Sequence, residues 1–401
     1  MGRVRRCVTG LAAGAAVLLA ACSANPSSTS APTRPAVRSP VAAAPATRAP
    51  GTAGALLSAT AERAELLPGI GFGGRAWLLS YRTTGGRGEP LTASGTLLVP
   101  ARPAAGRPLV AVAPATRGLA DRCAPSRTLR SGHDLEAYAY AQLLSRGWAV
   151  AVADTPGLGS AGEHPFAANR ALGPSVLDVV RAARAVPGAG VPAAGPIGLE
   201  GYSEGGGAVG EAAQLQPSYA PDVVLAGVAV GGVDADPLAA ARALDGTGYS
   251  WVVGYALAGL AAAYPALDVR AALTPLGAST LDRLRDSCSG DAPSAEPGGT
   301  RLTSLVTGDL LARPDVAAAL TAGTLGSVAP SAPVLLQHAV HDDLLPFTQA
   351  TGLRDRWCTA GARVRLEPIP TGGHVAGAVA ATPGAVSWLA DRFAGRPADG
   401  C

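Results

Sequence analysis

Residues 201–205 read GYSEG and follow an apolar run, so they match the pattern G-x-S-x-G. In this pattern a serine lies on a sharp turn from strand to helix, in a strained backbone conformation that requires small neighbours two positions away. Residues 205–210 read GGGAVG and match an overlapping pattern, G-x-G-x-x-G, whose backbone approaches a pyrophosphate. The first pattern predicts an exposed nucleophile at Ser203, whereas the second predicts a dinucleotide site.

The position of the glycines favours the nucleophile. In a dinucleotide site the first glycine closes the strand directly, but Gly205 lies four residues after Gly201, which ends the apolar run. Asp234 keeps the alternative open, because it follows the next apolar run, roughly where a ribose-binding acid would lie.

The residues that follow Ser203 in the chain supply what a nucleophilic serine needs. Asp342 and Asp343 come directly after the apolar run 332–340, and His374 comes after the run 364–370. A serine on such a turn is followed by an acid and then a histidine, in this chain order. The imidazole accepts the hydroxyl proton, and the carboxylate fixes the imidazole tautomer and stabilises its charged form.

Each of these residues also has a structural interpretation. Ser203 could cap a helix, His374 could lie on the surface, and the two aspartates could belong to a turn. His338, His341 and Asp342 resemble a metal-ligand set, but their spacing does not match a helix pair and no third anchor is evident. We therefore expect no metal and no cofactor.

The elements that must hold these residues alternate between apolar strands and helices. Strands are predicted at 76–84, 95–101, 108–115, 148–154, 195–201, 223–232, 332–340 and 364–370, and helices at 136–147, 176–186 and 206–216. Near-continuous apolar strands are typical of parallel sheets that are buried on both faces. The predicted fold class is α/β, with a mostly parallel central sheet flanked by helices and a possible antiparallel edge formed by the first two strands. Residues 234–325 lack convincing strands and predict an inserted helical cap.

The start of the chain predicts export. Arg3, Arg5 and Arg6 precede a short apolar stretch, and residues 19–22 read LAAC, which resembles a bacterial lipobox. We expect a signal peptide at 1–21 and lipidation of Cys22, which would anchor the protein to the outer face of the cell membrane. Ordinary cleavage is the alternative.

Composition limits the remaining possibilities. Residues 22–54 are rich in Ser, Pro and Ala, which predicts a disordered tether, and we expect the catalytic domain at 55–401. Removing the three arginines of the signal peptide lowers the formal charge from +3 to 0, which argues against nucleic-acid binding. The domain contains four cysteines, which allow three pairings and contain no C-x-x-C motif.

Several blocks taken together resemble the secretory lipase family of α/β-hydrolases, over most of residues 76–390. The matching blocks are APATRGLADRCAPS (113–126), DTPGLGSAGEHPF (154–166), GYSEGGGAVGEAAQLQPSYAPD (201–222), the HDDLLP region and GGH. The resemblance implies Ser203 as nucleophile and His374 as general base. The family acid precedes an x-x-V-P run, here residues 343–346, which implies Asp342 rather than Asp343.

The resemblance also implies an oxyanion hole, two disulfides and a reaction. One oxyanion donor is the backbone N–H of Glu204, and the second comes from the loop 115–118, where related sequences often read H-G-T-T-G and where we expect Gly118. The implied disulfides are Cys123–Cys288 and Cys358–Cys401.

The implied reaction is hydrolysis of triacylglycerols or shorter esters through an acyl-enzyme, with residues 234–325 as the lid. A peptidase or acyltransferase on the same scaffold, or a non-catalytic surface lipoprotein that binds apolar ligands, are the alternatives.

Overall fold

The computed structural model describes residues 51–102, 104–291 and 299–401. The predicted signal peptide, Cys22 and the first part of the predicted tether lie outside the described residues.

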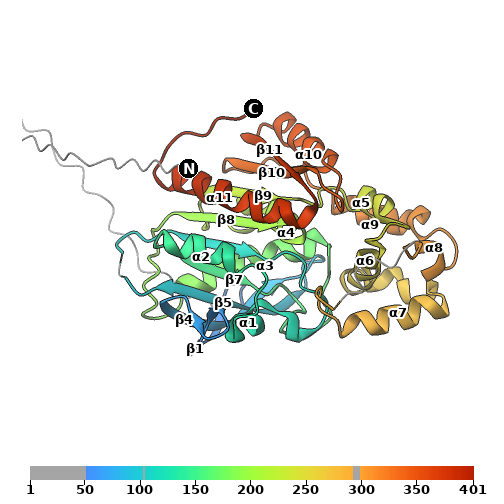
Figure 1. Cartoon of the computed structure of the whole chain (residues 1–401), viewed down its shortest axis with the longest axis horizontal. Helices are drawn as coiled ribbons and strands as arrows, with labels where there is room; N and C mark the ends of the chain where they lie inside the picture. Colours follow the sequence, from blue (N-terminus) through green and yellow to red (C-terminus); the bar gives the residue numbers. More distant parts are fainter. Residues whose placement is uncertain (1–50, 103, 292–298) are drawn as a thin grey trace, which may run out of the picture. The chain divides into compact units, whose positions relative to one another are not determined.

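A nine-stranded sheet in the order β1-β4-β5-β7-β6-β8-β9-β10-β11 forms the centre of the fold (Figure 1). Its strands are β1 (Leu56–Glu62), β4 (Gly74–Thr84), β5 (Pro90–Pro100), β6 (Leu109–Ala113), β7 (Ala149–Ala153), β8 (Ile197–Tyr202), β9 (Leu225–Gly231), β10 (Val334–His341) and β11 (Val364–Gly372). The strands from β7 to β11 are parallel to one another, whereas β1, β4, β5 and β7 pair antiparallel. The predicted sheet class and its antiparallel edge are therefore confirmed. A separate hairpin joins β2 (Glu65–Leu67) to β3 (Ile70–Gly71).

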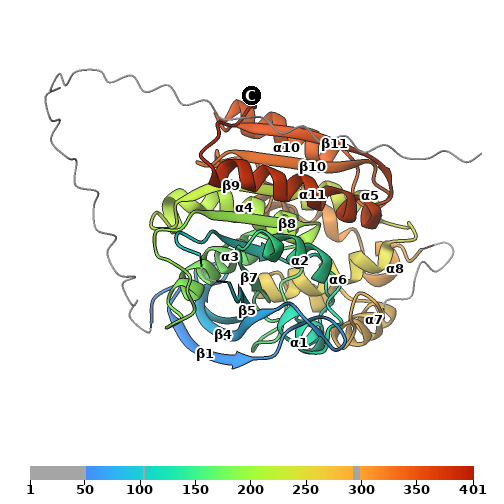
Figure 2. The ribbon, with the colours of Figure 1, turned by 60° about the vertical axis from the view of Figure 1, so that its left-hand side comes forward.

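Helices cover both faces of this sheet. On one face lie α3 (Asn169–Arg184), α4 (Glu204–Tyr219) and α10 (Thr348–Thr359), and on the other lie α2 (Ala137–Ser145) and α11 (His374–Phe393). Figure 2 shows α2 and α11 running along the same face. Strands β6 and β7, LVAVA and AVAVA, are buried at every position, as expected for strands covered on both sides.

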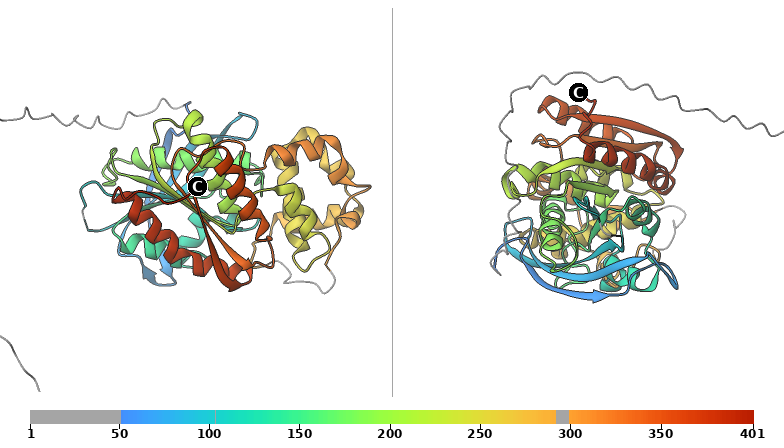
Figure 3. Two further views of the ribbon diagram at one scale, coloured as in Figure 1. Left: turned by 90° about the horizontal axis from the view of Figure 1, so that it is seen from above. Right: turned by 90° about the vertical axis from the view of Figure 1, so that its left-hand side faces the viewer.

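Between β9 and β10 the described residues are predominantly helical, where the sequence analysis expected a cap. The helices are α5 (Pro237–Leu244), α6 (Ser250–Ala263), α7 (Pro275–Arg285), α8 (Leu302–Leu305) and α9 (Pro314–Ala322), with short 3-10 turns at Pro265–Leu267, Val269–Ala272 and Leu310–Ala312. We call this segment the helical insertion. It has its own apolar cluster and lies beside one end of the sheet (Figure 3, left).

Within the described ranges, no single helix has the length and apolar composition of a membrane span. Helix α6 and the following segment Pro265–Ala272 meet that test only as a pair, which is bent by 106°. Four apolar side chains of α6, those of Val253, Leu257, Ala258 and Leu260, are buried in the apolar cluster of the helical insertion.

Three further short helical segments precede α2. They are α1 (Pro125–Thr128) and the 3-10 turns Asp121–Cys123 and Leu129–Ser131. They follow the loop that leaves β6, whose residues 115–117 line the same cavity as Ser203.

Candidate active site

Ser203 lies on the turn between β8 and α4 with a left-handed backbone conformation, φ 59° and ψ −124°. Its N–H donates to the carbonyl of Gly231 at 3.0 Å, which ties the turn to the neighbouring strand β9. A Cβ atom at Gly201 would lie 2.4 Å from the Gly205 carbonyl oxygen, and one at Gly205 would lie 2.1 Å from that of Ala113. Both flanking positions therefore need glycine, as the G-x-S-x-G interpretation requires.

The overlapping dinucleotide pattern does not form its loop. Residues 205–210 belong to helix α4 and are buried against neighbouring segments, so no glycine of this run lies in the strand-to-helix turn. The turn is made by Ser203 itself.

His374 and Asp342 follow strands β11 and β10, and their side chains meet. His374 Nδ1 lies 2.7 Å from Asp342 Oδ2, and Asp342 Oδ1 accepts the backbone N–H groups of Leu344 and Leu345 at 3.0 and 2.8 Å. Burial raises the pKa of Asp342, but the His374 hydrogen bond and these N–H groups outweigh it, so its pKa is lowered. The carboxylate is thus held in its ionised form.

The second aspartate has a different position. Asp343 Oδ1 accepts the backbone N–H of His374 at 2.7 Å, and Asp343 Oδ2 accepts the hydroxyl of Tyr249 at 2.5 Å. Tyr249 directly precedes α6, so Asp343 links the helical insertion to the main chain of His374.

His338, which the sequence analysis considered as a metal ligand, lies behind the acid. Its Nε2 is 2.9 Å from the Leu345 carbonyl oxygen and 3.5 Å from Asp342 Oδ2. Among the described residues no group of three or more His, Cys, Asp or Glu side chains is arranged to hold a metal ion.

Ser203 and His374 line one cavity of about 590 Å³ between the sheet and the helical insertion. His374 Nε2 is buried and has no hydrogen-bond partner among the described residues, so it is available to a hydroxyl in the cavity. Tyr202 donates its hydroxyl to the His374 carbonyl at 3.0 Å, and its ring packs against the imidazole ring of His374. The cavity wall formed by the insertion is mostly aliphatic, including Ala240, Leu244, Val252, Val253, Leu260 and Leu320.

Of the two predicted oxyanion donors, the structure places one beside Ser203 in the cavity and the other outside it. Glu204 begins helix α4 and lines the cavity, next to Ser203. Gly118 is not among the cavity-lining residues and instead pairs in an isolated bridge with Cys288, so the structure does not bring it to the nucleophile. Thr116, two residues earlier, does line the cavity, and its backbone N–H forms no hydrogen bond within the described residues.

The side chain of Glu204 belongs to a buried pair that the sequence analysis missed. His164 Nε2 lies 2.8 Å from Glu204 Oε1, and His164 Nδ1 lies 3.0 Å from the Pro156 carbonyl oxygen. Burial lowers the pKa of His164, but Glu204 outweighs it and raises that pKa. His164 thereby offsets the charge of the carboxylate that follows the nucleophile.

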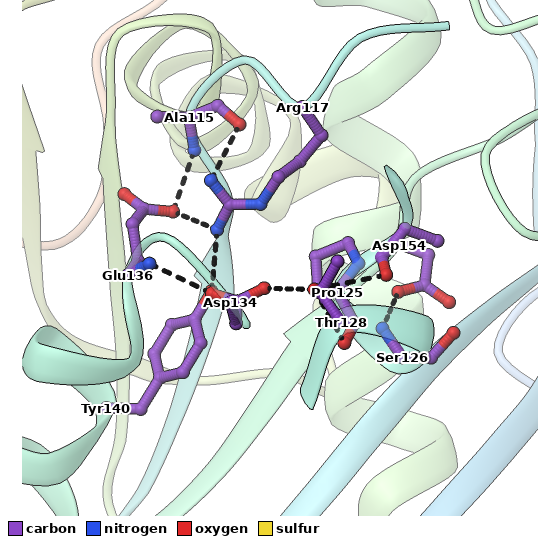
Figure 4. Close-up of polar contacts among 10 residues, drawn as sticks. Ala115, Arg117, Pro125, Ser126, Thr128, Asp134, Glu136, Tyr140 and Asp154 are labelled. Atoms are coloured by element: carbon purple, nitrogen blue, oxygen red, sulfur yellow. Dashed lines mark hydrogen bonds and ion pairs between the residues drawn. The ribbon is translucent and has the colours of Figure 1, made fainter. Parts of the chain in front are cut away.

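A second buried cluster holds the loop that carries Thr116 (Figure 4). Arg117 Nη2 donates to Glu136 Oε2 at 2.7 Å and to Asp134 Oδ1 at 3.1 Å, and Glu136 Oε2 also accepts the backbone N–H of Ala115 at 3.0 Å. Burial lowers the pKa of Arg117, but the two carboxylates outweigh it and raise that pKa. We call Arg117, Asp134 and Glu136 the loop cluster. An arginine in the block PATRG was its only local sign in the sequence.

Two disulfides, Cys123–Cys288 and Cys358–Cys401, have the pairing that the resemblance implied. The first joins the segment after the Thr116 loop to the helical insertion. The second joins α10 to the last residue of the chain.

The fold and the turn at Ser203 define an α/β-hydrolase, and the comparisons with known proteins agree. The family model of the secretory lipases matches residues 124–400, so this chain belongs to the secretory lipase family. Membership of this family, with its lipase relatives, supports a secreted lipase or esterase.

Two relatives and one solved structure show what the chain is similar to. The chain is 33% identical over 333 residues to a probable inactive lipase, MT1628, of Mycobacterium tuberculosis, covering 80% of this chain and 74% of that protein. It is 32% identical over 339 residues to the secreted triacylglycerol lipase LIP7 of Malassezia globosa, covering 80% and 71%. The fold is similar to Candida antarctica lipase A in its closed state, with a TM-score of 0.78, 23% identity and coverage of 87% and 84%.

Proposed function

We propose that this chain is an exported serine esterase of the lipase type, which hydrolyses carboxylic esters through an acyl-enzyme. The observation that carries the proposal is the shared cavity: the strained Ser203 and the unpartnered Nε2 of His374 both line it, with Asp342 on the far side of the imidazole.

In the proposed mechanism, Ser203 Oγ attacks the ester carbonyl carbon while His374 Nε2 accepts the hydroxyl proton. Asp342 accepts Nδ1–H, which keeps the tautomer with a free Nε2 and stabilises the imidazolium. The N–H groups of Glu204 and Thr116 donate to the oxyanion. The imidazolium then protonates the departing alkoxide, and a water molecule, deprotonated by His374, releases the carboxylic acid from the serine.

The substrate proposed is a triacylglycerol or a shorter ester of an apolar acid. The aliphatic wall of the insertion and a cavity of about 590 Å³ suit an acyl chain rather than a charged group. The relatives named as secreted triacylglycerol lipases support this substrate class.

The first test compares hydrolysis of p-nitrophenyl butyrate and palmitate by the wild type, Ser203→Ala and Ser218→Ala. Ser218 is an exposed serine of the same helix, so it is the matched control. We expect both esters to be hydrolysed by the wild type and the control, and neither by Ser203→Ala. Activity on butyrate alone would change the assignment to a short-chain esterase. A wild type that hydrolyses neither ester would refute the proposal and favour a ligand-binding lipoprotein.

We also propose that the chain is exported and anchored by a lipid on Cys22, which follows the LAA sequence at 19–21. Expression of Cys22→Ala tests this proposal. We expect the wild type in the membrane fraction and the variant in the medium or retained with its signal peptide. Equal partitioning of the two proteins would contradict lipid anchoring.

A further inference from the structure

The active-site cavity contains one acidic side chain that the proposed reaction does not use. Asp234 follows strand β9 and lines the cavity together with Ser203 and Glu204. Within the described residues its carboxylate accepts no hydrogen bond and forms no ion pair, and its Oδ1 is sealed from solvent. The residue as a whole is partly accessible and belongs to the lining of the cavity.

The charged groups around Asp234 do not compensate it. Glu204 is paired with His164, and Asp236 caps helix α5 by accepting the N–H of Ala239 at 3.0 Å. Burial, and then Asp236 and Glu204, raise the pKa of Asp234 to about 7. The other two carboxyl groups of the cavity are each paired with a basic side chain, Glu136 with Arg117 and Glu204 with His164, so Asp234 differs from both.

A buried carboxyl without a partner is costly, and native proteins leave few such groups unsatisfied. A leucine at this position would suit a cavity that receives only hydrocarbon. We therefore propose that Asp234 is a specificity-determining residue, which binds a hydroxyl group carried by the ester substrate inside the mostly apolar cavity. This inference rests on the proposed esterase function and specifies its substrate class as esters of hydroxylated acids.

Two observations favour a hydroxyl over an ammonium group. The surrounding cavity wall is mostly aliphatic, and bringing a second charge into it carries a large desolvation cost. Near neutral pH both forms of the Asp234 carboxyl are populated. A hydroxyl can donate to the carboxylate and accept from the carboxylic acid, whereas an ammonium group binds only the ionised form.

The position of Asp234 limits where this hydroxyl lies. Ser203 N–H is bonded to the Gly231 carbonyl, and Asp234 is three residues further along the chain, a span of at most roughly 11 Å. The hydroxyl is therefore expected on the part of the acyl chain near the ester, not at the far end of a long chain.

The experiment measures kcat/KM of the full chain for p-nitrophenyl decanoate and for derivatives with one hydroxyl at carbon 3, 6 or 9. The readout is the ratio of the hydroxylated to the plain ester. Both substrates are measured on one preparation, so any loss of folded protein cancels. The variants are Asp234→Leu, Asp234→Ala and Asp234→Asn, which keeps a carbonyl acceptor. Asp236→Asn is the matched control, because that neighbouring acid does not line the cavity.

With the hydroxyl at carbon 3 or 6, we expect the ratio to fall by about tenfold or more in Asp234→Leu and Asp234→Ala, which is the effect of losing one buried hydrogen bond to a charged group. Asp234→Asn should retain most of the ratio, and Asp236→Asn all of it. Ratios at carbons 3 and 6 that are equal in the wild type and in the leucine and alanine variants would overturn the proposal, even if carbon 9 shows an effect. The p-nitrophenyl esters of the corresponding aminodecanoic acids are measured beside them, and a wild type that prefers one of these to every hydroxydecanoate would also overturn the proposal. Failure of the wild type to hydrolyse any of these esters would instead refute the proposed function.

Discussion

Replacing Glu136 with glutamine perturbs the loop cluster without changing its shape. Glu136 Oε2 accepts two donors, Arg117 Nη2 at 2.7 Å and the N–H of Ala115 at 3.0 Å, and a glutamine carbonyl oxygen in the same place can accept both, so the substitution removes the negative charge and keeps both acceptor contacts. The buried hydrogen bonds lose their charged acceptor, which costs about 1–1.5 kcal/mol, the difference between a charge-assisted and a neutral hydrogen bond. Asp134 still accepts from Arg117, so the cost should stay below the roughly 3–5 kcal/mol of a fully broken buried pair.

The same substitution should slow the reaction, because Ala115 precedes the proposed oxyanion donor Thr116. Removing one oxyanion donor costs about 100- to 1,000-fold in kcat, and a displaced donor should cost less, about 10- to 100-fold. Urea unfolding gives the stability change, and hydrolysis of p-nitrophenyl butyrate gives kcat and KM. We expect kcat to fall with KM nearly unchanged.

The control is Glu89→Gln, which removes an exposed acid paired with Arg87 at 3.2 Å and should cost less than about 1 kcal/mol. If Glu136→Gln and Glu89→Gln have the same stability and the same kcat, the loop cluster does not position the oxyanion loop and this reasoning is wrong.

Two further predictions concern other parts of the structure. Tyr249→Phe removes the 2.5 Å hydrogen bond to Asp343, so we expect amide exchange in α6 to rise about tenfold while exchange in β8 is unchanged; equal exchange in both proteins would contradict the link. Burial, and then Glu136, raise the pKa of Glu200 to about 8, so the native state keeps a proton that the unfolded state loses near pH 4.5. Stability should therefore fall between pH 5 and 8, by at most about 1.4 kcal/mol per pH unit. In Glu200→Gln urea unfolding should show a smaller fall, and identical pH profiles would refute the raised pKa.

Much of the sheet could be predicted because its strands are short apolar runs that end at Gly or polar residues. The start of α3 could not. The predicted helix began at residue 176, whereas α3 begins at Asn169 and contains Gly173 and Pro174. The Asn169 side chain donates to the carbonyls of Asp234 and Gly323, which are distant in sequence, so the start depends on contacts that no local pattern contains.

The site likewise contains residues that could be predicted from the sequence and residues that could not. Ser203 and His374 were predicted from chain order and strand ends, whereas Asp342 was preferred to Asp343 because of the resemblance to the secretory lipases. The structure brings Asp342 and His374 into hydrogen-bond contact. Gly118 was chosen from its loop alone, and its pairing with Cys288 depends on where the helical insertion folds back.

The groups that support the site had weaker signals in the sequence. His164 is 40 residues from its partner Glu204, and no local sequence pattern predicts that the two side chains pair. The sequence singled out Asp234 as a possible ribose-binding acid, but the structure does not form a dinucleotide-binding loop. The position of Asp234 in the cavity depends on the three-dimensional fold.

The central claim is that Ser203 is an activated nucleophile, and a fluorophosphonate tests it most directly because such a reagent reports serine reactivity without assuming a substrate. The wild type, Ser203→Ala and Asp342→Asn are each incubated with the reagent, and the intact mass and the labelled peptide are measured. The account predicts one equivalent on Ser203 in the wild type, none in Ser203→Ala, and labelling slower by orders of magnitude in Asp342→Asn. A folded wild type that takes up no label, or takes it up on another residue, would contradict it.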